Sequence, residues 1–588
     1  MAIVTSASPL SGQAVPRHPV GSRAHILLSS VFGPYAQDDD YGSRELNPME
    51  LYQNQVTRGQ GPFSLRMFHR SWGIMLIHAN IDAPCTLLDF PTLERFTEEL
   101  CSAEYDIIGI SSILPNVEKV KKMCQLIRAH QPQATIVVGG HIANCHDLDQ
   151  RVDADYIVRG EGVRWFRQFL GEDPARPVRH PQISSAVRTR VMGFESSSAG
   201  RSCAATLIPS VGCPVGCNFC STSAMFGGKG QSVNFYESGD EIFRVMCGLE
   251  QGMQVRSFFV MDENFLLHRQ RALRLLELIE HHGKSWSLYV FSSARVLQAY
   301  AIEELVRLGI SWVWMGLEGK NSRYAKLSGV DTVSLVRTLQ SHGIRVLGSS
   351  IIGLEEHTPE NIVEAIEHAV SHETDFHQFM LYTPVPGTPL YAEHLANGTL
   401  REPDSYHEAD IHGQLHFRHL HSSISPGKEA ELILSAFQRD FEVNGPSVLR
   451  IARTLLQGWR RYKDHADRRI RERFAWEARD LTVMYPAALW AARRWFAERN
   501  PALVTKLSRL LTDIKREVGL RARVVAPLAG RFALWKLRRE EQLLRAGHTY
   551  EPPTFYEMNL QMRRLLRPHG GPPATLIRSV SACEPAVS

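Results

Sequence analysis

VGCPVGCNFC, residues 211–220, is the stretch of this 588-residue sequence that decides the fold. It holds three cysteines in the spacing C-x3-C-x2-C: Cys213, Cys217 and Cys220. In a reducing compartment, closely spaced cysteines indicate metal or redox chemistry more often than a disulfide. Gly212 and Gly216 favour a tight loop whose backbone passes close to a bound group. We therefore predict a metal site in this loop.

The loop supplies three ligands, whereas most structural zinc sites have four. The next histidine downstream, His268, is too distant in the sequence for a local zinc knuckle. Three thiolates instead suit a [4Fe–4S] cluster with one iron left open to a substrate or cofactor. Unrelated loop cysteines, or a disulfide with a spare thiol, are the alternatives that the spacing disfavours.

The composition is that of a globular protein, with 44% hydrophobic and 22% charged residues and a formal charge of +4. The length suits two or three domains. The first thirty residues do not resemble a secretory signal, and the longest apolar run, 481–492, is too short to span a bilayer. We therefore expect a cytosolic protein.

Residues 207–391 alternate short apolar runs with helical patterns, which is typical of βα units. Six such units predict a partial parallel barrel, with its chemistry at the C-terminal ends of the strands. The expected strands are ATLIPS (205–210), SFFVMDE (257–263), SLYVFSS (287–293), SWVWMGLE (311–318), RVLGSSIIG (345–353) and FHQFMLY (376–382).

The N-terminal third contains five apolar, β-rich runs that end in small residues. They are AHILLSS (24–30), WGIMLIHANI (72–81), YDIIGISS (105–112), ATIVVGGHI (134–142) and ADYIVRGEG (154–162). Amphipathic segments between them indicate a doubly wound parallel sheet, whose binding crevice lies at the C-terminal ends of the strands. Glycines at these ends would let the backbone approach a bulky ligand closely.

The cysteine spacing, with Phe219 before the last cysteine, resembles the signature of the radical S-adenosylmethionine (radical SAM) superfamily. The resemblance implies a [4Fe–4S] cluster on Cys213, Cys217 and Cys220, whose open iron chelates the amino and carboxylate groups of S-adenosylmethionine (SAM). It further implies that one electron cleaves SAM to a 5′-deoxyadenosyl radical, which abstracts hydrogen from an unactivated carbon. The protein would orient the cofactor and exclude water.

Polar residues at the ends of the expected barrel strands resemble the SAM-binding positions of this family. The MDEN motif after the second strand matches the motif near the methionine amino group, although alone it is also typical of a solvated loop. An arginine after the third strand suits a carboxylate, since its guanidinium bonds both oxygens. The residues that the resemblance assigns to SAM are Phe219, Asp262, Glu263, Asn264, Ser292, Arg295 and Glu318.

The N-terminal arrangement resembles the B12-binding domain that precedes the barrel in class B radical SAM enzymes. The sequence departs from the family in lacking D-x-H-x-x-G, so no histidine is marked to ligate cobalt, and in having Val163 where an acid is common. Cobalamin bound without a protein ligand and a purely structural sheet both remain open. The candidate cobalamin residues are Ser111, Ser112, Leu114, Gly139, Gly140, Gly160, Glu161 and Gly162.

The C-terminal part is strongly basic. Residues 450–545 contain 24 Lys and Arg against 10 Asp and Glu, and five of the ten tryptophans. The patterns predict amphipathic basic helices with aromatic anchors, suited to a membrane interface with anionic lipids. The alternative is a helical domain with aromatics in its core and arginines in solvent. Nucleic acid is not an expected partner, because no sheet or OB-fold pattern accompanies these residues.

Together these patterns predict an α/β protein with an N-terminal doubly wound parallel sheet, a central partial (βα)6 barrel and a C-terminal helical domain. The expected boundaries are a disordered tail 1–22, a B12-binding-like domain 23–180, a radical SAM barrel 200–400, a basic, mostly helical domain 401–565 and a disordered tail 566–588.

The predicted function is radical SAM alkylation of an unactivated carbon in a hydrophobic, lipid-like substrate, in the first instance cobalamin-dependent methylation. A second SAM would then remethylate the cobalt. A reductase, flavodoxin or ferredoxin would supply electrons to a cytoplasmic protein that could bind peripherally at the inner face of the membrane. The alternatives are cobalamin-independent C–C coupling or rearrangement in natural-product or lipid biosynthesis, and a non-catalytic cluster-binding scaffold or sensor. No catalytic residue beyond the cluster ligands is predicted.

Overall fold

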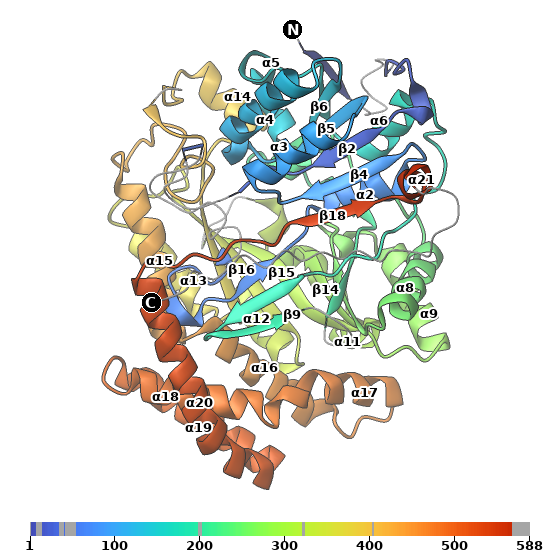
Figure 1. Ribbon diagram of the computed structural model, residues 1–588. Helices are drawn as coiled ribbons and strands as arrows, with labels where there is room; N and C mark the ends of the chain where they lie inside the picture. Colours follow the sequence, from blue (N-terminus) through green and yellow to red (C-terminus); the bar gives the residue numbers. More distant parts are fainter. Residues whose placement is uncertain are drawn as a thin grey trace, which may run out of the picture.

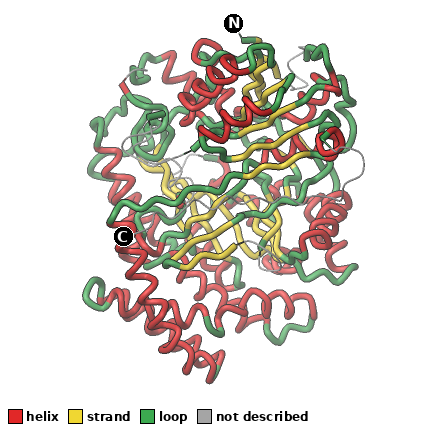
Figure 2. The backbone as a smooth tube through the Cα atoms, in the orientation of Figure 1, coloured by secondary structure: helices red, strands yellow, loops and turns green. Residues whose placement is uncertain are grey.

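The computed structural model describes residues 2–6, 15–33, 40–41, 54–197, 203–319, 324–402 and 405–566. Figure 1 shows an N-terminal α/β domain above a central α/β domain, with a set of C-terminal helices below. In Figure 2 the strands of the two α/β domains run through the middle of the molecule and helices lie around them. The predicted fold class is confirmed.

The N-terminal sheet has the strand order β1-β7-β6-β5-β2-β4-β18. All neighbouring strands pair in parallel except β4 and β18, which pair antiparallel. Its strands are β1 (Ile3–Ser6), β2 (Ile26–Ser29), β4 (Cys85–Asp89), β5 (Ile107–Ser111), β6 (Thr135–Gly139), β7 (Tyr156–Arg159) and β18 (Phe555–Met558). The helices of this domain are α2 (Trp72–Asn80), α3 (Leu93–Ser102), α4 (Val117–His130), α5 (Leu148–Arg151) and α6 (Gly162–Phe169).

Two expectations for this domain are wrong, and one strand was missed. The run 72–81 forms helix α2. The prediction failed because periodicity cannot separate a strand from a helix in so short an apolar run, and this one is buried on more than one side. The missed strand, β4, occupies Cys85–Asp89. The interval 1–22 is not entirely a tail, since β1 pairs with β7 at the edge of the sheet. The expected tail after 566 lies outside the described residues.

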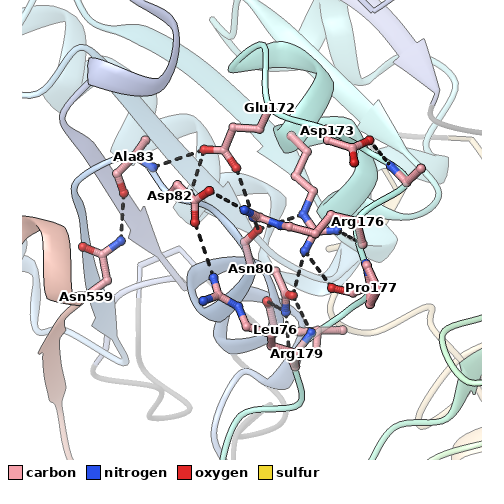
Figure 3. A network of polar contacts seen from close by, with 12 residues as sticks. Leu76, Asn80, Asp82, Ala83, Glu172, Asp173, Arg176, Pro177, Arg179 and Asn559 are labelled. Atoms are coloured by element: carbon pink, nitrogen blue, oxygen red, sulfur yellow. Dashed lines mark hydrogen bonds and ion pairs between the residues drawn. The ribbon is translucent and has the colours of Figure 1, made fainter. Parts of the chain in front are cut away.

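The C-terminal end of α2 is held by a polar network (Figure 3). The Asn80 side chain donates to Leu76 O and Arg179 O and accepts from Arg179 N, each over 2.8 Å. Glu172 accepts from the backbone amide of Asp82 over 2.8 Å, and Arg176 forms an ion pair with Asp82. These contacts fix α2 to the segment that follows α6.

The central sheet has the order β10-β13-β14-β15-β16-β17, with all strands parallel. Each predicted barrel run forms one of these strands. They are β10 (Ala204–Leu207), β13 (Ser257–Val260), β14 (Ser287–Ser292), β15 (Ile310–Glu318), β16 (Arg345–Ile352) and β17 (Phe376–Leu381). The helices of this domain are α7 (Ser221–Met225), α8 (Gly239–Met253), α9 (Arg269–His281), α10 (Ala294–Leu297), α11 (Ile302–Leu308), α12 (Thr332–Ser341), α13 (Ile362–Ser371) and α14 (Pro389–Ala396).

Two small antiparallel sheets complete the strands of the described residues. One has the order β3-β8-β9 and the other pairs β11 with β12. Their bounds are β3 (Arg66–Phe68), β8 (Arg188–Val191), β9 (Phe194–Ser197), β11 (Ser210–Val211) and β12 (Val233–Asn234).

The C-terminal part is helical, as predicted, and four of its helices share a core. Buried side chains of α16, α18, α19 and α20 pack together with Phe63 of the N-terminal region. The helices are α15 (Lys428–Asn444), α16 (Ser447–Tyr462), α17 (Arg468–Glu477), α18 (Met484–Phe496), α19 (Pro501–Val518), α20 (Leu520–Arg545) and α21 (Leu560–Leu565). No helix in the described ranges combines the length and apolarity needed to cross a bilayer.

A buried ion pair joins α15, α16 and the barrel. Arg450 Nη2 lies 2.6 Å from Asp440 Oδ2, and the two side chains are only 6% and 3% exposed. Arg450 also donates to Thr374 O over 3.1 Å, next to β17.

The change Asp440→Ala would leave this guanidinium buried without its carboxylate. We expect it to lower the free energy of unfolding by about 3–5 kcal/mol, measured by urea denaturation. The neighbouring Arg439 pairs with Glu367 at the surface, so Arg439→Ala should cost less than about 1 kcal/mol. Equal losses in the two variants would contradict this account of the buried pair.

Candidate active site

The cysteine loop lies between β11 and α7 and turns tightly. Gly216 N donates to Cys213 O over 3.3 Å, and Cys220 N donates to Cys217 O over 3.0 Å. Gly216 has a φ of +66°, and a Cβ there would lie 2.5 Å from Lys229 Cα. This position therefore requires glycine, both for its conformation and for its close approach to the returning chain.

The three cysteines of the loop are half-buried and free of disulfides. Burial raises the pKa of each thiol. The pKa of Cys213 is raised to about 11, first by burial and then by negative charge on Cys220 and Cys217. Within the described residues, no three His, Cys, Asp or Glu side chains are arranged to hold a single metal ion. Each of three irons of a cluster takes one thiolate, and the positive charge of the iron favours the thiolate form. Three cysteines on one loop are the donor set that a [4Fe–4S] cluster with one open iron requires.

Phe219 and Asn218 dock the loop against the far side of the barrel. The Phe219 ring meets the rings of Tyr324 and Tyr382 edge-on, at centroid distances of 5.2 and 6.1 Å. Asn218 Nδ2 donates to Tyr382 Oη, and Tyr324 Oη donates to Asn218 Oδ1, each over 3.2 Å. Sequence reasoning missed both tyrosines, whose only signal was their position after strand ends.

A lysine that the sequence did not mark lies beside the cysteines. Lys326, on a 3-10 turn at Ala325–Leu327, forms an ion pair with Glu318 at the end of β15. Its ammonium lies 5.4 Å from the Phe219 ring centroid, and its positive charge acts on the nearby Cys217 thiol. Lys326 therefore opposes the effect of burial on the pKa of the Cys217 thiol, and it brings Glu318 next to the loop.

Asp262 of the MDEN motif is bonded to neighbouring parts of the barrel. It forms a buried ion pair with Arg271 and accepts from Ser210 Oγ over 2.6 Å and from Asn264 N over 3.1 Å. Ser292 Oγ in turn donates to Asn264 Oδ1 over 3.3 Å. These bonds tie the ends of β13 and β14 to the strand that leads into the cysteine loop.

Glu263 and Arg295 differ from the other predicted SAM residues. Burial raises the pKa of Glu263 to about 7, and the charge of Asp262 adds to the shift. Its Oε2 is buried without a hydrogen-bond partner among the described residues. Arg295 is exposed on α10, and no described contact joins it to the other predicted SAM residues.

A chamber of about 590 Å³ lies between the two α/β domains. The N-terminal domain lines it with α2 and with the C-terminal ends of β5, β6 and β7. The barrel lines it with residues that flank the cysteine loop or follow β13: Val211, Thr222, Met225, Phe226, Met261 and Glu263. The binding crevice of the sheet and the cysteine loop therefore face one space.

Seven of the eight candidate cobalamin residues line this chamber. They are Ser111, Ser112, Gly139, Gly140, Gly160, Glu161 and Gly162. Leu114 does not line it, because it is buried in the core beneath α4. Glu161 is the N-cap of α6 and accepts from the amides of Val163 and Arg164, so its carboxylate is already bonded.

The structure also places His141 in the lining, a residue that was not among the candidates. Burial lowers the pKa of its imidazole, so the ring is neutral near pH 7. The hydroxyls, the neutral imidazole and the closely packed glycines are compatible with a large neutral ligand such as a corrin.

Comparison with known proteins agrees with both domains. The family model described as B12 binding domain matches residues 66–170, and the one described as Radical SAM superfamily matches residues 207–369. An uncharacterized methyltransferase of Pyrococcus horikoshii is 23% identical over 329 residues, covering 50% of this chain and 70% of the relative.

Two further relatives have named substrates. The bacteriochlorophyllide d C-12(1)-methyltransferase of Chlorobaculum tepidum is 27% identical over 195 residues, 32% of this chain and 42% of the relative. The hopanoid C-2 methylase of Rhodopseudomonas palustris is 23% identical over 353 residues, 57% of this chain and 63% of the relative.

Residues 207–369 match the radical SAM family model and hold the cysteine loop, so this part of the chain is a radical SAM domain. A B12-binding domain precedes it, which is the domain arrangement of class B radical SAM enzymes. The cofactors of the chain are a [4Fe–4S] cluster and SAM, and the N-terminal domain supports cobalamin as a third.

Replacing any one of Cys213, Cys217 and Cys220 by alanine should prevent cluster assembly. After anaerobic reconstitution we expect about four iron atoms per wild-type chain and close to background iron in each variant, measured by iron assay and absorbance. Cys247→Ala, in α8, is the matched control and should keep the wild-type iron content. Full iron content in any loop variant would refute the ligand assignment.

Glu263→Gln should change stability in a pH-dependent manner. The folded-state pKa is raised to about 7, so the folded state favours the protonated acid and loses stability as pH rises from about 4.5 through 7. In the cluster-free protein we expect the variant to exceed wild type by about 3 kcal/mol at pH 8, shrinking towards zero near pH 4.5, in urea denaturation. Glu277→Gln, at an exposed position of α9, should differ little at either pH. A gap that does not depend on pH would refute the buried, unpaired state of Glu263.

Proposed function

We propose that the protein transfers a methyl group to an unactivated carbon of a hydrophobic, lipid-like substrate, using SAM and cobalamin. The observation that carries this proposal is the chamber shared by the strand ends of the B12-binding domain and by the residues that flank the cysteine loop. A shared chamber allows a methyl carrier on one side and a radical generated on the other to reach the same substrate. When bound, the cluster and SAM would supply the hydrogen-abstracting radical, and the corrin would supply the methyl group.

The residues of the chain would bind and orient these groups. Cys213, Cys217 and Cys220 would hold the cluster. Glu263, with an unpartnered oxygen that is buried near the loop, is the carboxylate best placed to receive a cationic group of SAM. The remaining candidate SAM residues would support the cofactor from the neighbouring strand ends: Phe219, Asp262, Asn264, Ser292, Arg295 and Glu318.

The candidate cobalamin residues would form the opposite wall. Gly140 has a φ of +85°, and a Cβ there would lie 2.5 Å from Ser112 O, so this loop must be compact. Gly139 differs, because the nearest atom to its Cβ position is Val158 O at 3.8 Å. A larger side chain at Gly139 would therefore meet little protein and would project towards the chamber.

The apolar side chains of the barrel favour the proposal of a hydrophobic substrate. Aromatic side chains of β13, β14, β15 and β17 alternate with residues buried under the outer helices, and they form a series of ring contacts. Trp72, which lines the chamber, meets Phe259 at 5.8 Å, and the series continues through Tyr289 and Trp312 to Phe376, at centroid distances of 4.7, 5.7 and 5.3 Å. Tyr289, Trp312 and Phe376 pack against Val56 and Leu347 inside the barrel, behind the chamber. The chamber itself is lined largely by apolar side chains such as Ile74, Met225 and Phe226, which suits an apolar substrate.

The relatives are consistent with this substrate class, since two of them are named for a hopanoid and a bacteriochlorophyllide. We propose further that a reductase, flavodoxin or ferredoxin supplies the electrons. We also propose that the protein is cytoplasmic and binds peripherally to the inner face of the membrane.

The proposal is tested by Gly139→Leu, which fills the chamber with little strain elsewhere. Anaerobic wild-type protein reconstituted with cobalamin should retain about one corrin per chain and, with SAM and a reductant, form both 5′-deoxyadenosine and S-adenosylhomocysteine. The variant should lose most of the corrin and S-adenosylhomocysteine while still forming 5′-deoxyadenosine. These products are measured by optical spectra and mass spectrometry.

Gly248→Leu, at an open position on α8, is the matched control and should behave as wild type. Wild-type protein that retains no corrin but forms 5′-deoxyadenosine would favour cobalamin-independent radical chemistry. A wild type that forms neither product would favour a scaffold or sensor.

A further inference from the structure

Helix α20 has one side packed on the protein and one side open to solvent. On the packed side, Ala522, Ala526, Ala533 and Leu537 are buried. The last three belong to the core shared with the other C-terminal helices. On the open side, four large apolar residues are more than half exposed: Val524 54%, Leu528 63%, Phe532 53% and Trp535 52%. We call the surface formed by these four residues the α20 outer face.

The spacing of the outer face is that of a continuous helical stripe. Steps of four, four and three residues keep side chains on one side of an α-helix, which turns once in about 3.6 residues. The buried residues follow the same period on the opposite side. The outer face therefore does not contribute to the core, although its residues are as apolar as the core itself.

The charges around the outer face have one sign. Arg523, Arg531, Arg538 and Arg539 are exposed and Lys536 is half-buried, and residues 520–539 contain no acid. None of these five cations forms an ion pair among the described residues. Lys536 and Arg539 instead lie over the Trp535 ring, with centroid distances of 5.7 and 5.9 Å.

The first acids beyond this stretch are turned away from the outer face. Glu540 is buried in an ion pair with Arg190 of β8, at 2.6 Å. Glu541 accepts from Trp495 Nε1 over 3.0 Å and pairs with Arg545. The outer face is thus apolar in its middle and cationic at its margins, and residues 520–539 supply no carboxylate to neutralise it.

The other tryptophans of the basic region have a different role. Trp459, Trp490 and Trp495 pack against the shared helical core, and Trp476 lies beneath Arg479 at 3.8 Å. For Trp459, Trp490 and Trp495 the alternative prediction, aromatics in the core of a helical domain, agrees with the structure. Only Trp535 remains among the tryptophans as an exposed anchor.

We infer that the α20 outer face docks the protein on the surface of an anionic lipid bilayer. Leu528, Phe532 and Trp535 would enter the boundary between headgroups and acyl chains, and the flanking arginines would extend to the lipid phosphates. We favour an anionic bilayer as the binding partner because of charge complementarity. The apolar side chains match the acyl chains, and the charges around them, all positive, match the anionic headgroups. The inference assigns a surface to the peripheral membrane binding proposed above, and it does not require the proposed methyl transfer.

Helix α20 is also held rigidly enough to serve as a docking element. A Cβ on Gly193 would lie 2.7 Å from Lys536 O, so the turn between β8 and β9 is packed directly against the helix backbone. Phe194 meets Phe532 edge-on at 5.8 Å. The outer face therefore keeps a fixed orientation relative to the two α/β domains.

The test uses the full-length protein and extruded vesicles of equal parts phosphatidylcholine and phosphatidylglycerol, with pure phosphatidylcholine vesicles for comparison. Cosedimentation should show binding to the anionic vesicles that weakens strongly when salt is raised from about 0.1 M to about 1 M. The triple variant Leu528→Gln, Phe532→Gln, Trp535→Gln should bind at least about tenfold more weakly. So should Arg531→Gln, Arg538→Gln, Arg539→Gln.

The matched control is Val363→Gln, Leu395→Gln, Leu434→Gln, three exposed apolar positions on other helices, which should bind as wild type does. Thermal unfolding by circular dichroism should be alike for wild type and variants, since all the altered side chains are at the surface. Wild-type protein that ignores anionic vesicles would overturn the inference, as would outer-face variants that bind them fully. It would also be overturned if these substitutions abolished self-association or DNA binding while vesicle binding stayed the same.

Discussion

The arrangement of this protein depends on one geometric constraint: the carboxyl ends of two parallel sheets must open into the same enclosed space. Parallel strands deliver their following loops to a single edge, so each sheet has one edge that can offer glycines, hydroxyls and carboxylates. Helix α2 lies at this junction, with Trp72 in contact with Phe259 of β13. Gly162 is needed here, because a Cβ on it would lie 2.7 Å from the Ile77 side chain of α2. The close packing of α2 and α6 therefore helps to keep the chamber compact.

The acidic residues around the chamber differ in how their charge is balanced. Asp262 is paired with Arg271, Glu318 with Lys326, and Glu161 with the amides that begin α6. Glu263 alone among these four has a buried oxygen without a partner in the described residues and a pKa raised to about 7. A buried carboxylate oxygen without a hydrogen-bond partner costs stability unless a ligand compensates it. Asp262, Glu318 and Glu161 are therefore bonded within the protein, whereas Glu263 is available to a cofactor.

The sequence predicted most of what depends on local pattern. The six barrel strands, the cysteine loop and the glycine-rich strand ends follow from short apolar runs and fixed spacings. It failed where the outcome depends on distant parts of the chain. Residues 72–81 read as a strand because a buried helix and a buried strand can share one apolar pattern. Strand β18 forms only because β4 offers an unpaired edge, and Lys326 reaches Cys217 only through the fold.

The tertiary contacts that the sequence did not reveal also connect the C-terminal helices to the chamber. Glu540 of α20 pairs with Arg190, and Tyr550 donates to the same carboxylate over 3.0 Å, just before the chain runs into β18 (Figure 1). On β18, Glu557 pairs with Arg70, which itself lines the chamber. This continuous series of buried and half-buried contacts makes α20 and the N-terminal sheet parts of one support. A bilayer that held α20 would therefore also fix the direction in which the chamber faces, and this direction would determine whether the proposed lipid-like substrate enters without crossing water.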